Sequence, residues 1–258
     1  MYKKEELENT IHNESCLELM KKIPDNTIDL IVTDPPYPVI SWWNKKTFAN
    51  WFASSVLRKN DWKIFKHNDI KIQDYIGELY RILKDWTHAY IMVNALNLEN
   101  FMTEIRKVWF KIHTVLIWDK WNKVLWWRYM KNIEYIIFVR KWKAKRIKNI
   151  WTSHILQHTN PRWKIHHTEK PSSLWKELIE NSTGPWDLVY DPFAWVGWVW
   201  VACEESWRKY VLSELSKNFS EIIKLRLINK ETRSEIKEKL DDDMYLIDKE
   251  WNRLYPDE

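Results

Sequence analysis

Two short motifs place carboxylates, prolines and aromatic rings where they could hold a base and a nucleoside. The first is Asp34-Pro35-Pro36-Tyr37, directly after the apolar run 28–33. Such a run predicts a strand, so the motif stands at a carboxyl end of a strand, where open α/β sheets bind ligands. Because proline has no N–H group, the carbonyls of Asp34 and Pro35 have few local donors and can accept hydrogen bonds from an amino group. The ring of Tyr37 offers a face for an extruded base, although a proline-rich turn with a packed tyrosine explains these four residues equally well.

The second motif, DPFAWVGWVW at 191–200, lies between the apolar run 187–190 and the helical stretch 201–206. A glycine-bearing turn between strand and helix lets the backbone approach a ligand, and the helix N-terminus favours a negative group. The pattern fits a nucleoside cofactor. Glu214 follows the next predicted strand, 23 positions after Asp191, where an acid can accept hydrogen bonds from ribose hydroxyls. The alternative is that Glu214 is an acid stabilised by the dipole of the following helix.

The chain is unusually rich in tryptophan and poor in glycine. It has 20 Trp and 3 Gly, whereas average usage predicts about 18 Gly. Trp86, Trp109 and Trp142 stand beside turns or element boundaries, where the backbone favours glycine. Our hypothesis is that the source reads the UGA codon as glycine and that most of these tryptophans are glycine in the native protein. Trp118, inside an apolar run, is taken as genuine, Trp175 and Trp251 stay open, and the alternative is a truly tryptophan-rich chain.

The pattern of apolar residues predicts an α/β fold with a mostly parallel sheet. Short β-branched runs alternate with helix-period stretches, which is typical of this class. Strands are expected at 28–33, 88–93, 111–118, 134–139, 187–190 and 209–213. Helices are expected at 72–83, 98–108, 172–179, 201–206 and 216–240.

We expect one domain spanning 1–258, with inserted loops at 38–68 and 141–166. Long loops in compact domains are often functional. The second loop carries the basic run KWKAKRIK, which could bind phosphates, and Gln157, Asn160 and Arg162, which could reach base edges. A solvated basic loop is the alternative interpretation.

Composition limits the class of protein and its partners. The net charge is +5 and the pI about 8.9, which suits a polyanionic partner but does not require one. No apolar run has the length of a membrane span, and the N-terminus lacks a signal peptide, so we expect a cytoplasmic protein with no membrane partner. Cys16 and Cys203 are expected to be buried or neutral, and no metal site is predicted. His166 and His167 are expected to support the cofactor segment.

Taken together, the motifs resemble the β group of DNA amino-methyltransferases, in which DPPY precedes the cofactor motif. The resemblance covers almost the whole chain: the lead-in 11–37, the segment HHTEKPSSL at 166–174, DPFAWVGWVW, and RKYVLSEL with its following helix. It implies a Rossmann-like fold that uses S-adenosylmethionine and acts on double-stranded DNA. Members of this group often form homodimers.

The resemblance also implies roles for particular residues. Asp34, Pro35, Pro36 and Tyr37 would hold the target amino group. The cofactor would be bound by Asp191, Pro192, Phe193, Ala194, Trp195, Gly197, Glu214, Thr168, Lys170 and Pro171. Ser15 departs from the family, which usually has an acid at this position to contact the cofactor adenine. Trp195 and Trp200 would put bulky indoles into a turn that needs close backbone approach.

The expected reaction is methylation of adenine N6, because a DPPY motif, in place of SPPY, resembles the adenine N6 enzymes more than the cytosine N4 enzymes. Cytosine N4 is the alternative target. A non-catalytic DNA-binding relative is a second alternative if the tryptophans of the cofactor turn are genuine. RNA and protein-amide methyltransferases are rival classes, but they usually carry the cofactor motif first, so the order of motifs argues against them. A nicotinamide dehydrogenase is a third rival, which would leave the DPPY motif unexplained.

Overall fold

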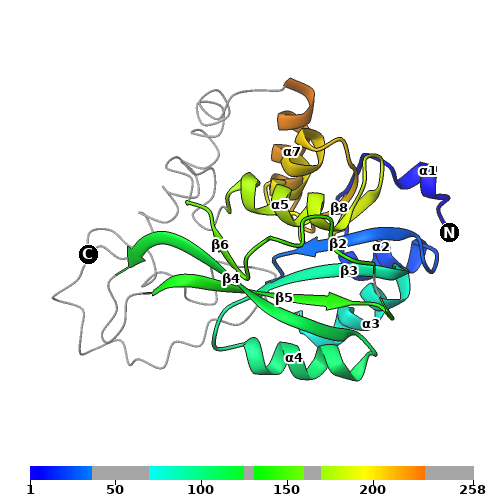
Figure 1. Cartoon of the computed structure of the whole chain (residues 1–258). Helices are drawn as coiled ribbons and strands as arrows, with labels where there is room; N and C mark the ends of the chain where they lie inside the picture. The colour runs from blue at the N-terminus through cyan, green and yellow to red at the C-terminus, as the bar shows by residue number, and fades with distance from the viewer. Residues whose placement is uncertain (37–69, 125–130, 144, 160–169, 230–258) are drawn as a thin grey trace, which may run out of the picture.

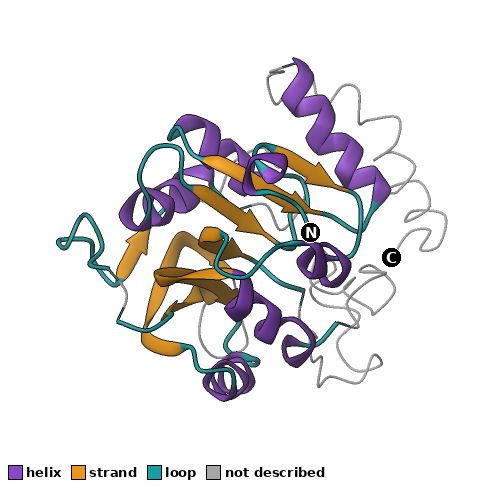
Figure 2. Ribbon diagram, turned by 90° about the vertical axis from the view of Figure 1, so that its right-hand side faces the viewer, coloured by secondary structure: helices purple, strands orange, loops and turns teal. Residues whose placement is uncertain are grey.

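The computed structural model describes residues 1–36, 70–124, 131–143, 145–159 and 170–229. An eight-stranded sheet runs through it, with helices against both faces (Figures 1 and 2). The strands are β1 Thr10–His12, β2 Ile28–Thr33, β3 Leu83–Val93, β4 Lys111–Val124, β5 Lys131–Arg140, β6 Ile155–Gln157, β7 Leu188–Asp191 and β8 Lys209–Ser213. The helices are α1 Lys4–Leu7, α2 Cys16–Lys22, α3 Ile72–Ile82, α4 Leu98–Lys107, α5 Ser172–Ser182, α6 Trp198–Glu205 and α7 Lys217–Asn229.

The strand order is β1-β8-β7-β2-β3-β5-β4-β6. The first five of these strands are parallel to one another, β5 is antiparallel to both β3 and β4, and β6 is parallel to β4. The predicted α/β class with a mostly parallel sheet is confirmed. Because β7 and β2 are neighbours, segments far apart in the sequence meet at one edge of the sheet.

Two apolar layers enclose the sheet, and β2 contributes to both. Leu30 and Val32 pack on the side of α5, α6 and α7, whereas Ile31 packs on the side of α2, α3 and α4. Figure 1 shows α5 and α7 above the sheet and α3 and α4 below it. A strand buried on both faces needs a nearly continuous apolar run, which explains why Leu30, Ile31 and Val32 lack the alternation of a half-exposed strand.

The six predicted strands are present, but β1 and β6 were not predicted. Each has three residues, too few to show a periodic pattern. β6 lies inside the segment 141–166 that was expected to be a loop, and it pairs with β4 through Ile155 and Ile117. The backbone N–H of Lys148 also donates to the Asn181 carbonyl (2.8 Å). The described part of this segment therefore lies along the sheet and α5. The expected insertion 38–68 and the expected helix beyond Asn229 lie outside the described residues.

Tryptophan dominates the left-handed backbone positions of the described chain. Nine non-glycine residues there have positive φ, and apart from Asn9 and Asn26 all are tryptophan. Their φ angles lie between 50° and 73°, and the residues are Trp86, Trp109, Trp121, Trp142, Trp186, Trp195 and Trp207. Such angles are uncommon for residues other than glycine, and residues with bulky side chains that adopt them are outliers.

Two further expectations concern the cysteines and the membrane. Cys16 and Cys203 are buried free thiols, as predicted, and burial raises the pKa of Cys16 to about 12. Among the described residues, no helix is long and apolar enough to cross a membrane.

Candidate active site

The two motifs predicted to carry chemistry meet where β2 and β7 end. The strands pair through Leu30 with Val189 and Ile31 with Tyr190. Just beyond, the Thr33 hydroxyl donates to Oδ1 of Asp191 (3.0 Å) in a buried hydrogen bond. We call residues 191–197, between β7 and α6, the cofactor turn. The end of β2, which leads into Asp34, is thus tied to the start of this turn.

Asp34 is buried and paired with an equally buried ammonium group. Nζ of Lys170 lies 2.5 Å from Oδ2 of Asp34 and 3.7 Å from Oε2 of Glu134, and Glu134 also accepts from Lys120. Burial alone lowers the pKa of Lys170, but the two carboxylates outweigh it and the pKa is raised. Burial raises the pKa of Asp34, with Lys170 opposing. Lys170 therefore stays charged, with carboxylates on two sides.

The rest of the DPPY motif and its neighbours are only partly described. Pro35 is buried and Pro36 half-buried. Pro171 is buried at the N-cap of α5, and its carbonyl accepts from the Leu174 N–H (3.1 Å). Tyr37 and Thr168, which were predicted to take part in the site, lie outside the described residues, as do His166 and His167.

Backbone hydrogen bonds hold the cofactor turn against β8. The Ala194 N–H donates to the Ser213 carbonyl (3.0 Å), and the Ser213 hydroxyl donates to the Pro192 carbonyl (2.8 Å). Gly197 has a φ of 82°, and a Cβ there would lie 3.1 Å from Ile223. This position therefore requires glycine, and α6 begins directly after it.

Glu214 and Asp191 are buried acids on either side of this turn. Oε2 of Glu214 accepts from the Trp195 N–H and Oε1 from the Ser216 N–H, both at 2.8 Å. Burial raises the pKa of Glu214 to about 7, and burial likewise raises the pKa of Asp191 to about 7. A carboxylate oxygen has two lone pairs, so Glu214 can also accept hydrogen bonds from ribose hydroxyls. Its contact with Ser216, just before α7, equally fits the alternative role at a helix N-terminus.

Aromatic side chains lie on both sides of the cofactor turn. The Phe193 ring packs edge-on against Tyr75, with centroids 5.1 Å apart. The Trp195 indole N–H donates to the Asp34 carbonyl (3.2 Å), and its ring lies 6.0 Å from Phe219. The Trp195 indole thus reaches from the cofactor turn to the DPPY motif. The buried acids and Gly197 fit a nucleoside cofactor, whereas this indole takes one of the acceptors expected to hold the target.

Sequence reasoning missed several residues around the site. Thr33, Glu134 and Lys120 join the two motifs or the buried charges, and Asn13 donates to the Glu214 carbonyl (2.9 Å). No local signal marked them, because their roles depend on strand pairing across long stretches of chain. Ser15, which replaces the expected acid, accepts from the Leu17 N–H (3.3 Å) and caps α2.

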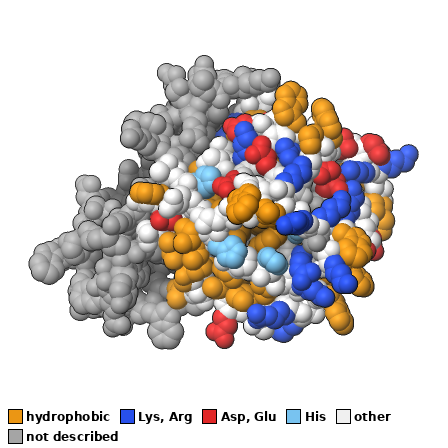
Figure 3. All heavy atoms as spheres, in the orientation of Figure 1, with side chains coloured by type: hydrophobic (Ala, Val, Ile, Leu, Met, Phe, Trp, Pro, Cys, Tyr) orange, Lys and Arg blue, Asp and Glu red, His pale blue; other side chains and the backbone are white. Residues whose placement is uncertain are grey.

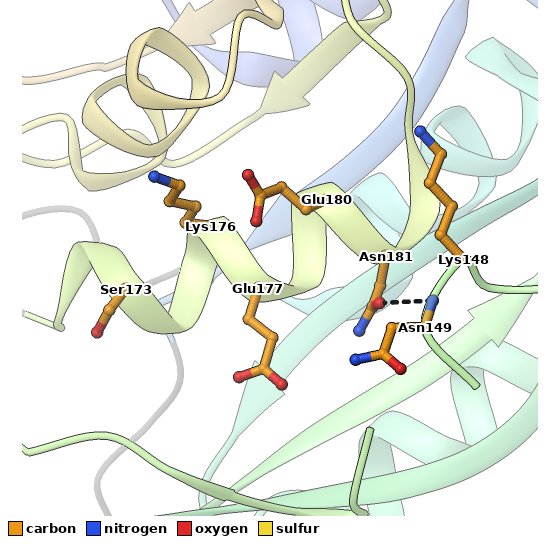
Figure 4. A pocket seen from close by; sticks show the side chains of 7 residues that line it. All are labelled: Lys148, Asn149, Ser173, Lys176, Glu177, Glu180 and Asn181. Atoms are coloured by element: carbon orange, nitrogen blue, oxygen red, sulfur yellow. Dashed lines mark hydrogen bonds between the residues drawn. The ribbon is translucent and has the colours of Figure 1, made fainter. Parts of the chain in front are cut away.

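A separate hollow lies between α5 and residues 141–148, which we call the basic segment (Figure 4). Its lining side chains carry both charges, and they are Lys148, Asn149, Ser173, Lys176, Glu177, Glu180 and Asn181. None of them belongs to either motif, so this hollow is not the candidate site.

Figure 3 shows many Lys and Arg side chains on the right-hand part of one face. Among the described residues, no cluster of His, Cys, Asp and Glu could hold a metal ion.

Known proteins share this fold. Among solved structures, the complex of M1.HpyAVI with SAM has a TM-score of 0.64 at 19% identity, covering 84% of this chain and 98% of that one. The cytosine-N4-specific PvuII DNA methyltransferase has a TM-score of 0.68 at 16% identity, covering 89% and 90%. The chain thus has the fold of the S-adenosylmethionine-dependent methyltransferases.

Sequence relatives narrow the class. Type II methyltransferase M2.MboI of Moraxella bovis is 27% identical over 258 residues, covering 89% of this chain and 92% of the relative. DNA adenine methyltransferase YhdJ of Escherichia coli is 25% identical over 266 residues, covering 86% and 82%. Residues 28–225 match the N6/N4 family model described as DNA methylase. The chain belongs to this family and is a DNA methyltransferase of adenine N6 or cytosine N4 specificity.

Proposed function

We propose that the protein transfers a methyl group from S-adenosylmethionine to N6 of adenine in double-stranded DNA. The observation that carries this proposal is the meeting of Asp34 and the Asp191 turn at adjacent strand ends, tied by the Thr33–Asp191 hydrogen bond (3.0 Å). An acceptor for an amino group and a turn for a nucleoside cofactor thus lie side by side. DPPY and the adenine-specific relative YhdJ favour adenine over cytosine.

Most of the catalysis in this proposal comes from positioning. S-adenosylmethionine supplies an already activated methyl group, so the chain has to orient the target nitrogen and its lone pair. The Asp34 carboxylate and the Pro35 carbonyl would accept hydrogen bonds from the amino hydrogens and stabilise the charge that develops on the nitrogen. Burial raises the pKa of Asp34, which makes its carboxylate a stronger acceptor. No cysteine nucleophile is needed.

The donor would be held by the turn and the acids around it. Glu214 would accept hydrogen bonds from the ribose hydroxyls, Phe193 and the backbone 191–197 would wrap the nucleoside, and Lys170 and Pro171 would line the methionine end. Thr168 and Tyr37 keep their expected roles, the former beside the donor and the latter stacking on the extruded base. Target recognition is assigned to the two insertions, 38–68 and 141–166, within one domain. We expect action in the cytoplasm, where DNA is accessible, and size-exclusion chromatography with light scattering will show whether a homodimer forms.

The decisive experiment is transfer of labelled methyl groups to unmethylated duplex DNA, followed by nucleoside analysis. The assay uses the chain with glycine at position 195, because the indole there bonds to the Asp34 carbonyl. N6-methyladenine is the expected product. If the product is N4-methylcytosine, the target base is cytosine and not adenine. Absence of transfer despite donor binding would favour a non-catalytic DNA-binding protein.

A further inference from the structure

We infer that the functional protein carries glycine at the seven left-handed tryptophan positions, and that glycine at 195 opens the donor site. The part concerning position 195 rests on the proposed function, whereas the other six positions stand on backbone geometry. These six are Trp86, Trp109, Trp121, Trp142, Trp186 and Trp207.

The distribution of residue types at positive φ is the first argument. Among the described residues, the types found there are asparagine, glycine and tryptophan, and tryptophan occupies seven of the ten positions. Asparagine tolerates this conformation because its short polar side chain bonds locally, and glycine because it has no Cβ. An indole has neither property. No Leu, Ile, Val, Phe or Tyr in the described chain has positive φ, so bulk alone does not lead to these positions.

Two of the tryptophans occupy helix ends where glycine is the usual residue. α6 ends at Glu205 with Ser206 as its C-cap, so Trp207 stands at the first position outside the helix, and the Arg208 N–H returns to the Cys203 carbonyl (2.9 Å). Trp109 has the same place after α4 and its C-cap Val108. Helices commonly end with a left-handed residue at this position, usually glycine.

The six indoles away from the site gain little from the fold. Their exposed fractions run from 49% at Trp86 to 79% at Trp109. Trp118 is the contrast, because it is fully buried and its indole N–H donates to the His158 carbonyl (2.8 Å). Trp118 is thus packed and hydrogen-bonded, in contrast to the six exposed indoles.

At position 195 the indole has a specific consequence for the site. Its N–H donates to the Asp34 carbonyl (3.2 Å), so it takes an acceptor expected to face the target. The backbone N–H of the same residue bonds to Glu214 (2.8 Å), and glycine keeps that bond. Glycine would therefore preserve the turn, remove the indole and free the carbonyl.

The first test is stability and does not depend on function. A variant with glycine at all six positions away from the site should melt higher than the parent by roughly 2–8 °C for each replacement, because left-handed strain is removed. The control is Trp118→Gly, which should melt lower. A lower melting temperature for the six-glycine variant would overturn the inference, as would peptides from the native protein that carry tryptophan at these positions.

The second test is donor binding, measured by calorimetry with S-adenosylmethionine. Trp195→Gly should bind at least about tenfold more tightly than the parent, because no indole then projects from the turn that is proposed to wrap the nucleoside and that needs close backbone approach. Trp207→Gly is the matched control, since it has the same backbone conformation away from the site, and its affinity should match that of the parent. Equal affinities for Trp195→Gly and the parent would contradict the assignment at 195. Tighter binding without methyl transfer to DNA would leave the inference standing and refute the proposed function.

Discussion

Nζ of Lys170 lies 2.5 Å from Oδ2 of Asp34, joining the segment before α5 to the end of β2 across 136 positions of sequence. Glu134, on β5, flanks the same ammonium at 3.7 Å. A buried ammonium is tolerable because carboxylates surround it. Three separate parts of the chain therefore depend on one charged group.

Replacing Lys170 with methionine should destabilise the fold strongly. The change leaves the buried Asp34 without its cation and removes one of the two cations beside the half-buried Glu134. Breaking a buried pair in this way costs about 3–5 kcal/mol. Urea denaturation measures the difference. Lys176→Met is the control, because Lys176 is partly exposed and lies 3.7 Å from Glu205, a surface pair worth about 0–1 kcal/mol. Equal losses in the two variants would mean that the buried cluster does not stabilise the chain.

Donor affinity should depend on pH near neutrality. Burial raises the pKa of Glu214 to about 7, and its side chain accepts hydrogen bonds from ribose more strongly when it is ionised than when it is protonated. Affinity should therefore fall by up to about tenfold for each pH unit below 7, and Glu214→Gln should bind more weakly with a flatter profile. Calorimetry between pH 5.5 and 8.5 with glycine at 195 measures both. An unchanged slope in the variant would exclude Glu214 as the titrating group.

Folding stability should change with pH in the opposite direction. Asp191 and Glu214 both have a folded pKa of about 7, above the values of 3.8 and 4.5 for free side chains. The folded state therefore holds more protons than the unfolded state between these values, and the free energy of unfolding contributed by the two acids falls as pH rises from about 4 to 7. Denaturation of Asp191→Asn and Glu214→Gln should show a shallower fall than the parent. A parent profile that rises over this window in step with the variants would contradict the assignment.

Trp118→Phe should destabilise the chain by about 1–3 kcal/mol, because the His158 carbonyl loses its donor. The matched control is Trp109→Phe, whose side chain is exposed and should change stability by less than about 0.5 kcal/mol. Chemical denaturation of the two variants separates a structural tryptophan from one that the fold does not use. Equal effects would remove the distinction.

The basic segment should set the salt dependence of DNA binding. Its exposed cations in the described chain are Lys143, Lys145, Arg146 and Lys148. Each cation that contacts a phosphate adds about 0.9 to the slope of log affinity against log salt, so replacing all four with alanine should flatten the slope by up to about 3.6. The control replaces Lys21 and Lys107, on α2 and α4, and should keep the parent slope. Titrations of labelled duplex in 50–300 mM salt decide between a DNA contact and a solvated loop.

Much of the fold followed from apolar runs and helix-period stretches long enough to be recognised. β2 and β8 have the predicted bounds, because runs such as 28–33 are buried on both faces and bounded by polar residues. β1 and β6 escaped prediction since three residues carry no period and their stability comes from pairing with distant strands. The N-cap at Ser15 was not predicted either, although Ser15 and Glu18 have the spacing of a capping box.

The site could be predicted where its residues are consecutive in the sequence. It could not be predicted where strand pairing brings distant residues together. Asp34 and the turn at Asp191 stood out as motifs, and their meeting followed from a parallel sheet. Glu134 and Thr33 carry no motif, since the pairing of β5 with β3 and of β2 with β7 decides what they touch. The excess of tryptophan was visible in composition, and Trp109 stood beside an expected element boundary, but the left-handed position of Trp207 needed backbone angles.

The Thr33–Asp191 bond and the ladder between β2 and β7 have a consequence for inheritance. Strand register aligns the two halves of the proposed reaction centre, and a slip of one residue would turn every side chain of β2 to the other face. Apolar core residues such as Ile31, which lie outside both motifs, are therefore expected to matter for methylation. We expect a mutation at such a position to give a folded protein that no longer methylates DNA. A search limited to the two motifs would miss the cause of this loss.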